Sequence, residues 1–181
     1  MVTARVESTS VREARAGDVP AVAAVHSRAW RAAYADLLDA GTLAALAPAA
    51  LEGAWRAAIT SPPSPRHAVL VALADDLVVG FAAVAPSGDA DAGEADGELV
   101  ALAVDPLHQR AGHGSRLLAA AADRLREDGF TAVAAWTPAP DAPRRAFLAS
   151  AGLVEDGATR AYAGQDLTEV RHAAALPEGG T

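Results

Sequence analysis

The stretch Val104-Asp105-Pro106-Leu107-His108-Gln109-Arg110-Ala111-Gly112-His113-Gly114-Ser115-Arg116 joins an apolar run to an amphipathic segment. The pattern predicts a buried strand at residues 98–104, a turn, and a helix at residues 112–127 that two glycines open. A helix N-terminus offers unsatisfied N–H groups and a favourable dipole to an anion, and glycine lets a phosphate approach the backbone closely. Arg110 can add a charge-assisted hydrogen bond. The residues alone therefore predict a phosphate or pyrophosphate site, and the alternative is a tight turn without a ligand.

The same segment resembles the signature of the GNAT (Gcn5-related N-acetyltransferase) superfamily, in which Val-x-Pro ends a strand and Gln/Arg-x-x-Gly-x-Gly/Ala opens a helix. Val104-Asp105-Pro106 and Gln109–Gly114 match it in full. The resemblance covers about residues 10–175, and the segment from His26 to Tyr34 is similar to a common bacterial subgroup. It implies a single α/β (α+β) domain with a mixed, mostly antiparallel sheet of six or seven strands and about four helices.

The resemblance also implies that acetyl-CoA, as co-substrate, lies on this segment. The backbone amides of about Arg110–Ser115 would hold its pyrophosphate, and the strand that ends at Val104 would pair with the pantetheine arm. A strand that splays from its neighbour leaves N–H and C=O groups unpaired, and an extended amide-bearing ligand can satisfy them. The predicted coenzyme contacts are Leu102, Ala103, Val104, Gln109, Arg110, Ala111, Gly112, His113, Gly114, Ser115, Asp141 and Phe147.

Acyl transfer from a thioester to an amine needs a base for the amine proton, a donor for the developing oxyanion, and a leaving thiolate. A free backbone N–H on the strand 102–104 can serve the oxyanion. Glu98 opens the predicted central strand, where many members of the family carry the base, and burial would raise its pKa. The alternative is that Glu98 only continues the acidic segment 86–97, which we expect to be a flexible loop that either attracts a cationic acceptor or is merely solvated.

The segment 141–152 departs from the family pattern. The Asn that the family often carries falls on Asp141, and the Tyr that often serves as the general acid falls on Leu148. Asp141 can still accept hydrogen bonds, but leucine has no proton to donate. Solvent, Tyr34 or Tyr162 would then protonate the thiolate, or turnover is weak.

Several other residues have both a functional and a structural interpretation. Trp30 and Tyr34 lie one helical turn apart, and the resemblance places them beside the acceptor cleft, where they would bind substrate; core packing is the alternative. His26 is expected on the surface of the same helix, with a place in the acceptor cleft as the alternative. Arg144-Arg145 is expected to be a solvated pair, with the 3′-phosphate end of the coenzyme as the alternative partner.

The composition excludes several chemistries. The 181 residues include no Cys, Lys or Asn, 49 Ala, and 15 basic residues that are all Arg, against 23 Asp+Glu, for a net charge of −8. Without Lys there is no Schiff-base or P-loop lysine, and without Cys no thiol nucleophile or disulfide. The acidic balance disfavours nucleic acid, no apolar run approaches the ~18 residues of a membrane span, and the histidines lack metal-ligand spacing. We therefore expect a soluble, cytoplasmic protein with no metal, and the resemblance of residues 26–34 to a bacterial subgroup implies a bacterial source.

Periodicity and turn residues predict the surrounding elements. Strands are expected at residues 10–16, 68–73, 77–85, 98–104, 130–136, 153–155, 159–163 and 168–175. Helices are expected from Asp18 to about Leu38, at 42–59 with a break at Pro48, at 112–127 and at 143–151. Residues 1–9 are expected to be a ragged end and 176–181 a flexible tail. The hairpin 159–175 could pair between two copies in a homodimer.

Two functions follow from these patterns. The first is an N-acetyltransferase, in which a primary amine of a small molecule or peptide attacks acetyl-CoA directly in a ternary complex. The second is a catalytically weak or inactive acyl-CoA-binding sensor or interaction protein, and the leucine at position 148 is its motive.

Overall fold

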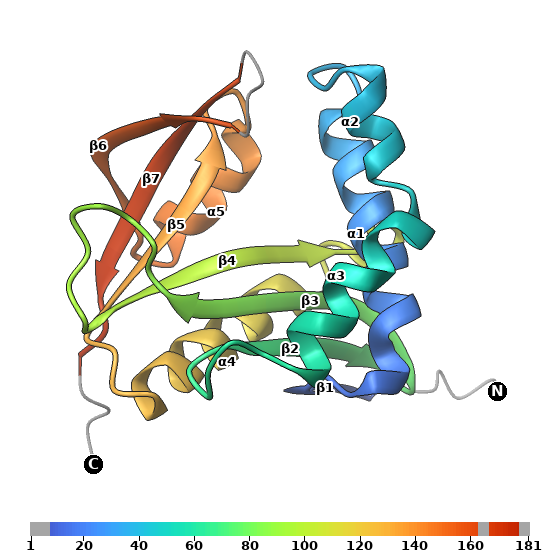
Figure 1. The fold of residues 1–181 in the computed structure, drawn as a ribbon, viewed down its shortest axis with the longest axis horizontal. Coiled ribbons are helices and arrows are strands. Elements are labelled where there is room, and N and C mark those ends of the chain that lie inside the picture. The colour runs from blue at the N-terminus through green and yellow to red at the C-terminus, as the bar shows by residue number, and fades with distance from the viewer. Residues whose placement is uncertain (1–7, 163–166, 178–181) are drawn as a thin grey trace, which may run out of the picture.

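One seven-stranded sheet with helices on both faces makes up the computed structural model, which describes residues 8–162 and 167–177 (Figure 1). The strands are β1 (Thr9–Glu13), β2 (Ala68–Ala74), β3 (Leu77–Pro86), β4 (Asp96–Val104), β5 (Ala132–Pro138), β6 (Val154–Ala161) and β7 (Thr168–Ala175). The helices are α1 (Val19–Tyr34), α2 (Ala40–Ala45), α3 (Pro48–Thr60), α4 (His113–Glu127) and α5 (Ala142–Ser150). The strand order is β1-β2-β3-β4-β5-β7-β6, and only β4 and β5 run parallel. The predicted single domain with a mixed, mostly antiparallel sheet is confirmed.

The two faces of the sheet bury different helices. On one face, α4 contributes Leu117 and Leu125 to a core that continues into β2, β3, β4 and β5. On the other face, Val22 of α1 and Trp55 of α3 pack against Phe81 of β3. Figure 1 shows α4 and the pair α1–α3 on opposite sides of the central strands. The apolar spacing along each helix is thus the reason that it lies on the sheet.

The parallel pair β4–β5 is short, and this opens the sheet. The register joins Asp96, Gly97 and Glu98 only to residues 132–134, and the two strands then part. In Figure 1, β4 runs toward α1 while β5 turns away beside β7. Beyond Glu98 the edge of β4 that faces β5 is therefore open, and its backbone groups need other partners.

Some helix bounds differ from the sequence prediction. The predicted first helix to Leu38 is wrong at its end, because α1 stops at Tyr34. A new helix starts shortly after, since the Asp39 carboxylate accepts a hydrogen bond from the Thr42 N–H at 2.9 Å and caps α2. The predicted break at Pro48 is confirmed: α3 begins there, where a proline ring fits the first helical turn.

The C-terminal strands also differ. Residues 154–161 form one strand instead of two short ones, with an irregular register between Glu155 and Thr159; Ala163 lies outside the described residues. Leu176 does not belong to a flexible tail, because its side chain is buried in the core and its N–H bonds the carbonyl of Thr131 at 2.7 Å. Residues 1–7 and 178–181, assigned to ragged ends, also lie outside the described residues.

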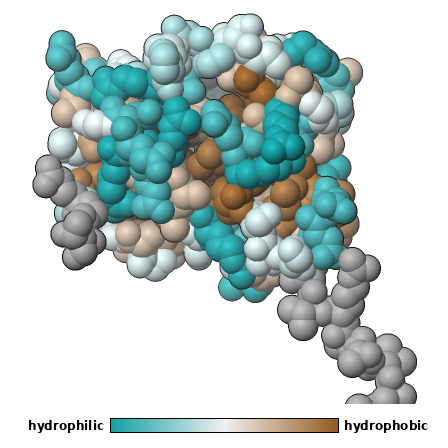
Figure 2. All heavy atoms as spheres, turned by 90° about the horizontal axis from the view of Figure 1, so that it is seen from below, coloured by the Kyte–Doolittle hydropathy of each residue, from teal (hydrophilic) through white to brown (hydrophobic). Residues whose placement is uncertain are grey.

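The molecular surface is mixed in character. On the face seen from below, hydrophobic side chains are interrupted by large hydrophilic areas (Figure 2). Within residues 8–162 and 167–177, no helix has the length and apolar character to cross a membrane.

Candidate active site

The predicted phosphate segment forms the turn between β4 and α4. A 3-10 turn, Pro106–His108, follows the strand, and the chain then enters left-handed backbone at Arg110 (φ 65°) and Gly112 (φ 82°). Gly112 is the N-cap of α4, and its carbonyl accepts the first helical bond from the Arg116 N–H. A side chain at Gly112 would be strained, and its Cβ would lie 3.2 Å from a guanidinium nitrogen of Arg116. The glycine therefore keeps the amides at the start of α4 accessible.

A cavity of about 880 Å³ lies directly in front of this turn. Its walls come from α1, from the open edge of β4, from the turn itself and from α5. Every predicted coenzyme contact except Ala111 lines it, and so do Trp30 and Tyr34. The structure thus brings residues from three separate stretches of the chain, within 29–37, 102–115 and 140–147, around one volume. Helix-terminal amides at one end and an open strand edge along one wall are the features that a phosphate-bearing, extended amide ligand would require.

The open edge of β4 presents alternate residues. The Asp105 N–H donates a hydrogen bond to the Val79 carbonyl of β3 at 2.8 Å. Because backbone polar groups alternate in direction along a strand, those of Asp105 and Ala103 point to β3. Leu102 and Val104 therefore direct theirs toward the opening, where their carbonyls accept hydrogen bonds from side chains. The Arg144 guanidinium bonds Leu102 O at 2.8 Å, and the Gln109 amide bonds Val104 O at 3.5 Å. Ala103 turns its polar groups to β3 and lines the cavity by other atoms.

The end of β4 is anchored to α1 through Asp105. This buried carboxylate accepts hydrogen bonds from the Leu107 N–H at 3.0 Å and from Arg28 Nε at 2.8 Å. Burial alone would raise the pKa of Asp105, but these two hydrogen bonds outweigh it and hold the pKa below its ordinary value. The aspartate of the Val-Asp-Pro motif thus fixes the position of the turn relative to α1.

Asp141 and Tyr34 form a second link across the cavity. The Tyr34 hydroxyl donates a short hydrogen bond to one carboxylate oxygen of Asp141, and the other oxygen accepts the Arg144 N–H at 3.0 Å as the N-cap of α5. Burial raises the pKa of Tyr34. The expectation that Asp141 accepts hydrogen bonds in place of an asparagine is confirmed. The buried side chain of Tyr34 packs with Leu38 and Leu46, which confirms the packing interpretation, and it also lines the cavity; its role in substrate binding stays a prediction.

Glu98 lies where β4 still pairs with β5 and does not line the cavity. Its neighbours Gly97 and Leu99 contact the α4 core, so the pleat turns the half-buried Glu98 side chain to the opposite face. Burial raises the pKa of Glu98, and the charge of Arg160 opposes this effect. A carboxyl group with a raised pKa suits a general base, and its role stays a prediction.

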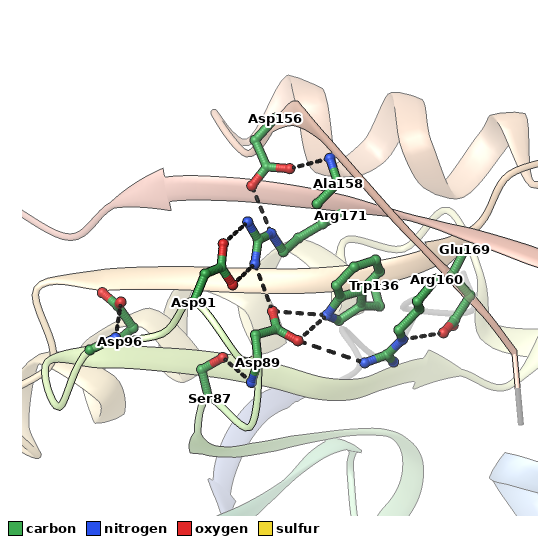
Figure 3. Close-up of polar contacts among 11 residues, drawn as sticks. Ser87, Asp89, Asp91, Asp96, Trp136, Asp156, Ala158, Arg160, Glu169 and Arg171 are labelled. Carbon is green, nitrogen blue, oxygen red and sulfur yellow. Dashed lines mark hydrogen bonds and ion pairs between the residues drawn. The ribbon is translucent and has the colours of Figure 1, made fainter.

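The acidic segment 86–97 is held against the sheet, which corrects the expectation of a flexible loop. Arg171 of β7 pairs with Asp91 at 2.7 Å and with Asp89 at 3.0 Å, and the Trp136 indole donates to Asp89 at 3.1 Å (Figure 3). Arg160 stacks over the Trp136 ring and bonds Glu169. Asp89 and Asp91 are already paired with Arg171, so these two carboxylates are not free to attract a cationic acceptor.

The network has no motif in the sequence. Arg160, Arg171 and Trp136 come from three strands of the sheet, and only the pairing of those strands brings them to one loop. Alternating positions on predicted strands are the one signal that groups them, and this signal does not identify the loop that they bind.

His26 is not a surface histidine. Its ring accepts a hydrogen bond from the Trp55 indole at 3.1 Å and contacts the rings of Trp30 and Phe81. Burial lowers the pKa of His26 to about 4, so the ring is neutral near pH 7. The sequence misleads here because the aromatic partners lie on α3 and β3, far along the chain.

The two adjacent arginines of α5 do not form a solvated pair. Arg145 bonds Glu155 at 2.7 Å and the Ala139 carbonyl at 2.8 Å, on the outer side of the helix. Arg144 turns inward to Leu102. Leu148, one turn further, is 1% exposed and packs in the α4-side core, so it does not face the cavity. Within the described part of the chain, no group of three or more His, Cys, Asp or Glu residues could hold a metal ion.

Comparison with known proteins identifies the family. The model of the acetyltransferase (GNAT) family matches residues 27–153, which is more than half of the chain. The uncharacterized N-acetyltransferase YuaI of Bacillus subtilis (strain 168) is 32% identical over 130 residues, 70% of this chain and 70% of YuaI. The chain therefore belongs to the GNAT acetyltransferase family and is an acyltransferase.

Solved structures share the fold. An acetyltransferase of the GNAT family from Desulfovibrio desulfuricans superposes with a TM-score of 0.73 at 19% identity, covering 94% of this chain and 100% of that one. YncA of Salmonella typhimurium, solved with its cofactor acetyl-CoA, has a TM-score of 0.65 at 22% identity and covers 96% of both chains. The fold is therefore shared with these structures, including the sheet in which β4 and β5 part after a short parallel pairing, which we call the split sheet.

Proposed function

We propose that this chain transfers the acetyl group of acetyl-CoA to a primary amine, which attacks directly in a ternary complex. The observation that carries the proposal is the single cavity that joins the start of α4 to the open edge of β4. The similarity to YncA, solved with acetyl-CoA, supports the same ligand.

The residues present fit this ligand. The amides of residues 110–115 at the glycine turn would hold the pyrophosphate, and the outward-facing backbone groups of Leu102 and Val104 would pair with the pantetheine amides. The bound thioester supplies the activated acetyl group. An outward N–H on the same strand edge would stabilise the oxyanion.

Glu98 would accept the amine proton, directly or through water. A protonated amine has no lone pair for attack, so a nearby base with a raised pKa increases the reactive fraction. Trp30 and Tyr34 would form the acceptor side of the cavity, since both line it from α1. His113, Ser115 and Phe147 would complete the wall of the coenzyme site.

The test is coenzyme A binding by calorimetry, followed by thiol release from acetyl-CoA with a panel of amines. We expect binding, release with at least one amine, and a fall of about 10²-fold in kcat for Glu98→Gln with unchanged coenzyme affinity. An unchanged rate in Glu98→Gln would remove the base assignment. A chain that binds no coenzyme A would overturn the proposal as a whole.

A second function has one specific observation in its favour. Leu148 is in the core, so the usual proton donor to the thiolate is absent from its position. A chain that binds acetyl-CoA and releases no thiol with any amine would be an acyl-CoA-binding protein of the same fold.

A further inference from the structure

Among the described residues, Arg144 lines the cavity without a carboxylate partner. Its side chain is half-buried and lines the cavity wall, and its guanidinium donates to Leu102 O at 2.8 Å. In the part of the chain that the structure describes, no carboxylate oxygen lies within 4.0 Å of it. Its neighbour Arg145, in contrast, pairs with Glu155. A guanidinium has five N–H donors, and the bond to Leu102 uses one of them.

The position of this cation relative to the reaction follows from the chain. The turn at residues 110–115, which would hold the pyrophosphate and which we call the phosphate cradle, follows the C-terminal end of β4. An extended ligand that runs back from it along the open edge passes Val104 before Leu102. Each residue of a strand advances the chain by about 3.3 Å. Arg144 therefore sits on the edge between the phosphate cradle and Glu98, where the thioester end of the ligand must lie for the base to act.

Other proton donors to a leaving thiolate are poorly placed. Leu148 is in the core, and the Tyr34 hydroxyl already donates to Asp141. The Tyr162 ring packs beside Trp30, outside the set of residues that line the cavity. Within the described part of the chain, Arg144 is thus the evident partner for the negative charge that develops on sulfur.

We propose that the Arg144 guanidinium stabilises the coenzyme A thiolate as it leaves. The inference rests on the proposed acetyl transfer. In that reaction the amine nitrogen forms a bond to the acetyl carbon, the C–S bond breaks with its electron pair going to sulfur, and the amine proton goes to Glu98. Because arginine keeps its proton at any working pH, it acts by charge and hydrogen bonding, and the thiolate takes its proton from solvent afterwards.

The surrounding titratable groups leave this role to Arg144. Asp141, the N-cap of α5, already accepts hydrogen bonds from the Tyr34 hydroxyl and the Arg144 N–H. On β7, Glu169 is bonded to Arg160, and His172 lies beside Glu155. The remaining groups that line the cavity are His108, Arg110 and His113, at the phosphate end.

The test measures the thiol pKa of bound coenzyme A, through the ultraviolet absorbance of the thiolate across a pH titration. The chain has no cysteine, so the ligand carries the only thiol in the sample. We expect wild type to lower this pKa by about one unit or more from a free value of about 8.5. The affinity for coenzyme A should then rise about tenfold from neutral to alkaline pH, whereas desulfo-coenzyme A should show no such rise.

Three variants make the result specific. Arg144→Gln should return the bound thiol pKa to its free value and lower kcat, Arg144→Lys should keep most of the shift, and Arg145→Gln should behave as wild type. The lysine variant keeps the proposal testable if the glutamine variant fails to fold. Coenzyme A that binds wild type with an unshifted thiol pKa overturns this inference alone. Failure of wild type to bind coenzyme A overturns the proposed function and this inference together.

Discussion

Leu148 occupies the position at which the resemblance to the family predicts a tyrosine acid, and the structure shows what surrounds this leucine. Its side chain is in the core beside Leu102 and Leu117, so restoring a tyrosine would not restore an acid. We predict that Leu148→Tyr destabilises the fold by about 1–3 kcal/mol through overpacking and leaves the pH–rate profile unchanged. Denaturant unfolding and steady-state rates measure both effects.

The control for this variant is Leu148→Met, which conserves volume and should cost less than about 1.5 kcal/mol. A Leu148→Tyr enzyme that is as stable as wild type and faster would contradict the buried position, because the hydroxyl would then have reached the cavity.

His26 gives a prediction about pH at the same scale. Burial lowers its pKa from 6.5 to about 4, so the unfolded chain binds a proton that the folded chain excludes between these values. Stability should therefore be complete above about pH 6.5 and fall as the pH drops toward 4, by roughly 2–3 kcal/mol. His26→Gln keeps an acceptor for Trp55 and should flatten this part of the stability curve in chemical denaturation. His67→Gln is the control, and the same slope in both variants would contradict the assignment.

Residues such as His26 show which contacts cannot be predicted from the sequence. The left-handed glycine turn and the start of α4 could be predicted, because a local motif determines both, and phosphate binding at this turn stays a prediction. Arg144 and His26 could not, because each depends on a partner from another element: Leu102 on β4 for the arginine, and Trp55 on α3 for the histidine. The local pattern around each residue is that of an ordinary exposed helix position.

At the scale of elements, α4 offers a matched pair of glycines. Gly112 precedes the helix and Gly129 follows it, and both have φ of 82°. Alanine at either position should cost about 1–2 kcal/mol of stability through left-handed strain. Only Gly112→Ala should also weaken coenzyme A binding, by at least tenfold, since only that glycine borders the cavity. Calorimetry on both variants separates the two effects. Equal affinity for coenzyme A in both would contradict a binding role for the turn at Gly112.

The loop 86–97 is held by hydrogen bonds from Arg171 to its aspartates, together with bonds from Trp136 to Asp89 and from Arg66 to the Glu94 carbonyl. Arg171 bonds Asp89 and Asp91, and the loop also makes an internal bond from the Ser87 N–H to the Asp96 carbonyl. We predict that Arg171→Gln speeds amide hydrogen exchange in residues 86–97 about tenfold, because charged hydrogen bonds to the loop are lost. Arg145→Gln, which alters an ion pair elsewhere, should leave this exchange unchanged. No change in Arg171→Gln would show that the loop is held by other contacts.

Helices and strands could be predicted where the apolar periodicity was long or where a residue such as proline ended a helix. Pro48 splits the second helical segment as expected, and α4 shows the predicted apolar face. Strand β6 was predicted as two short strands because its residues are mostly exposed and carry no clear alternation; its pairing with β7 is what makes it one strand. Tertiary pairing thus decided the elements whose own sequence is weakly patterned.

At the scale of the whole molecule, the split sheet is held open by links between its two halves and the helices. Arg28 on α1 ties the end of β4 through Asp105, and Tyr34 on α1 ties α5 through Asp141. Both links start from α1, so this helix spans the cavity opening. The open edge of β4 has no strand partner, and its Leu102 and Val104 carbonyls bond Arg144 and Gln109 instead, so side-chain links replace part of the missing ladder.

The Asp105 link predicts how the molecule responds to acid. Its hydrogen bonds to Leu107 and Arg28 hold the pKa of the carboxyl below the ordinary 3.8, so the folded state favours the charged form. The stabilisation is complete above about pH 4 and is lost as the pH falls through the lowered pKa, after the histidine effect is complete. Asp105→Asn should cost about 1–3 kcal/mol at pH 7 and reduce the acid dependence below pH 4. Thermal unfolding across this range measures both, with Asp123→Asn as the control, because Asp123 pairs with Arg126 at an exposed site where an ion pair contributes little. If both variants unfold alike, Asp105 does not anchor the turn between β4 and α4, and the position of that turn must depend on α4 alone.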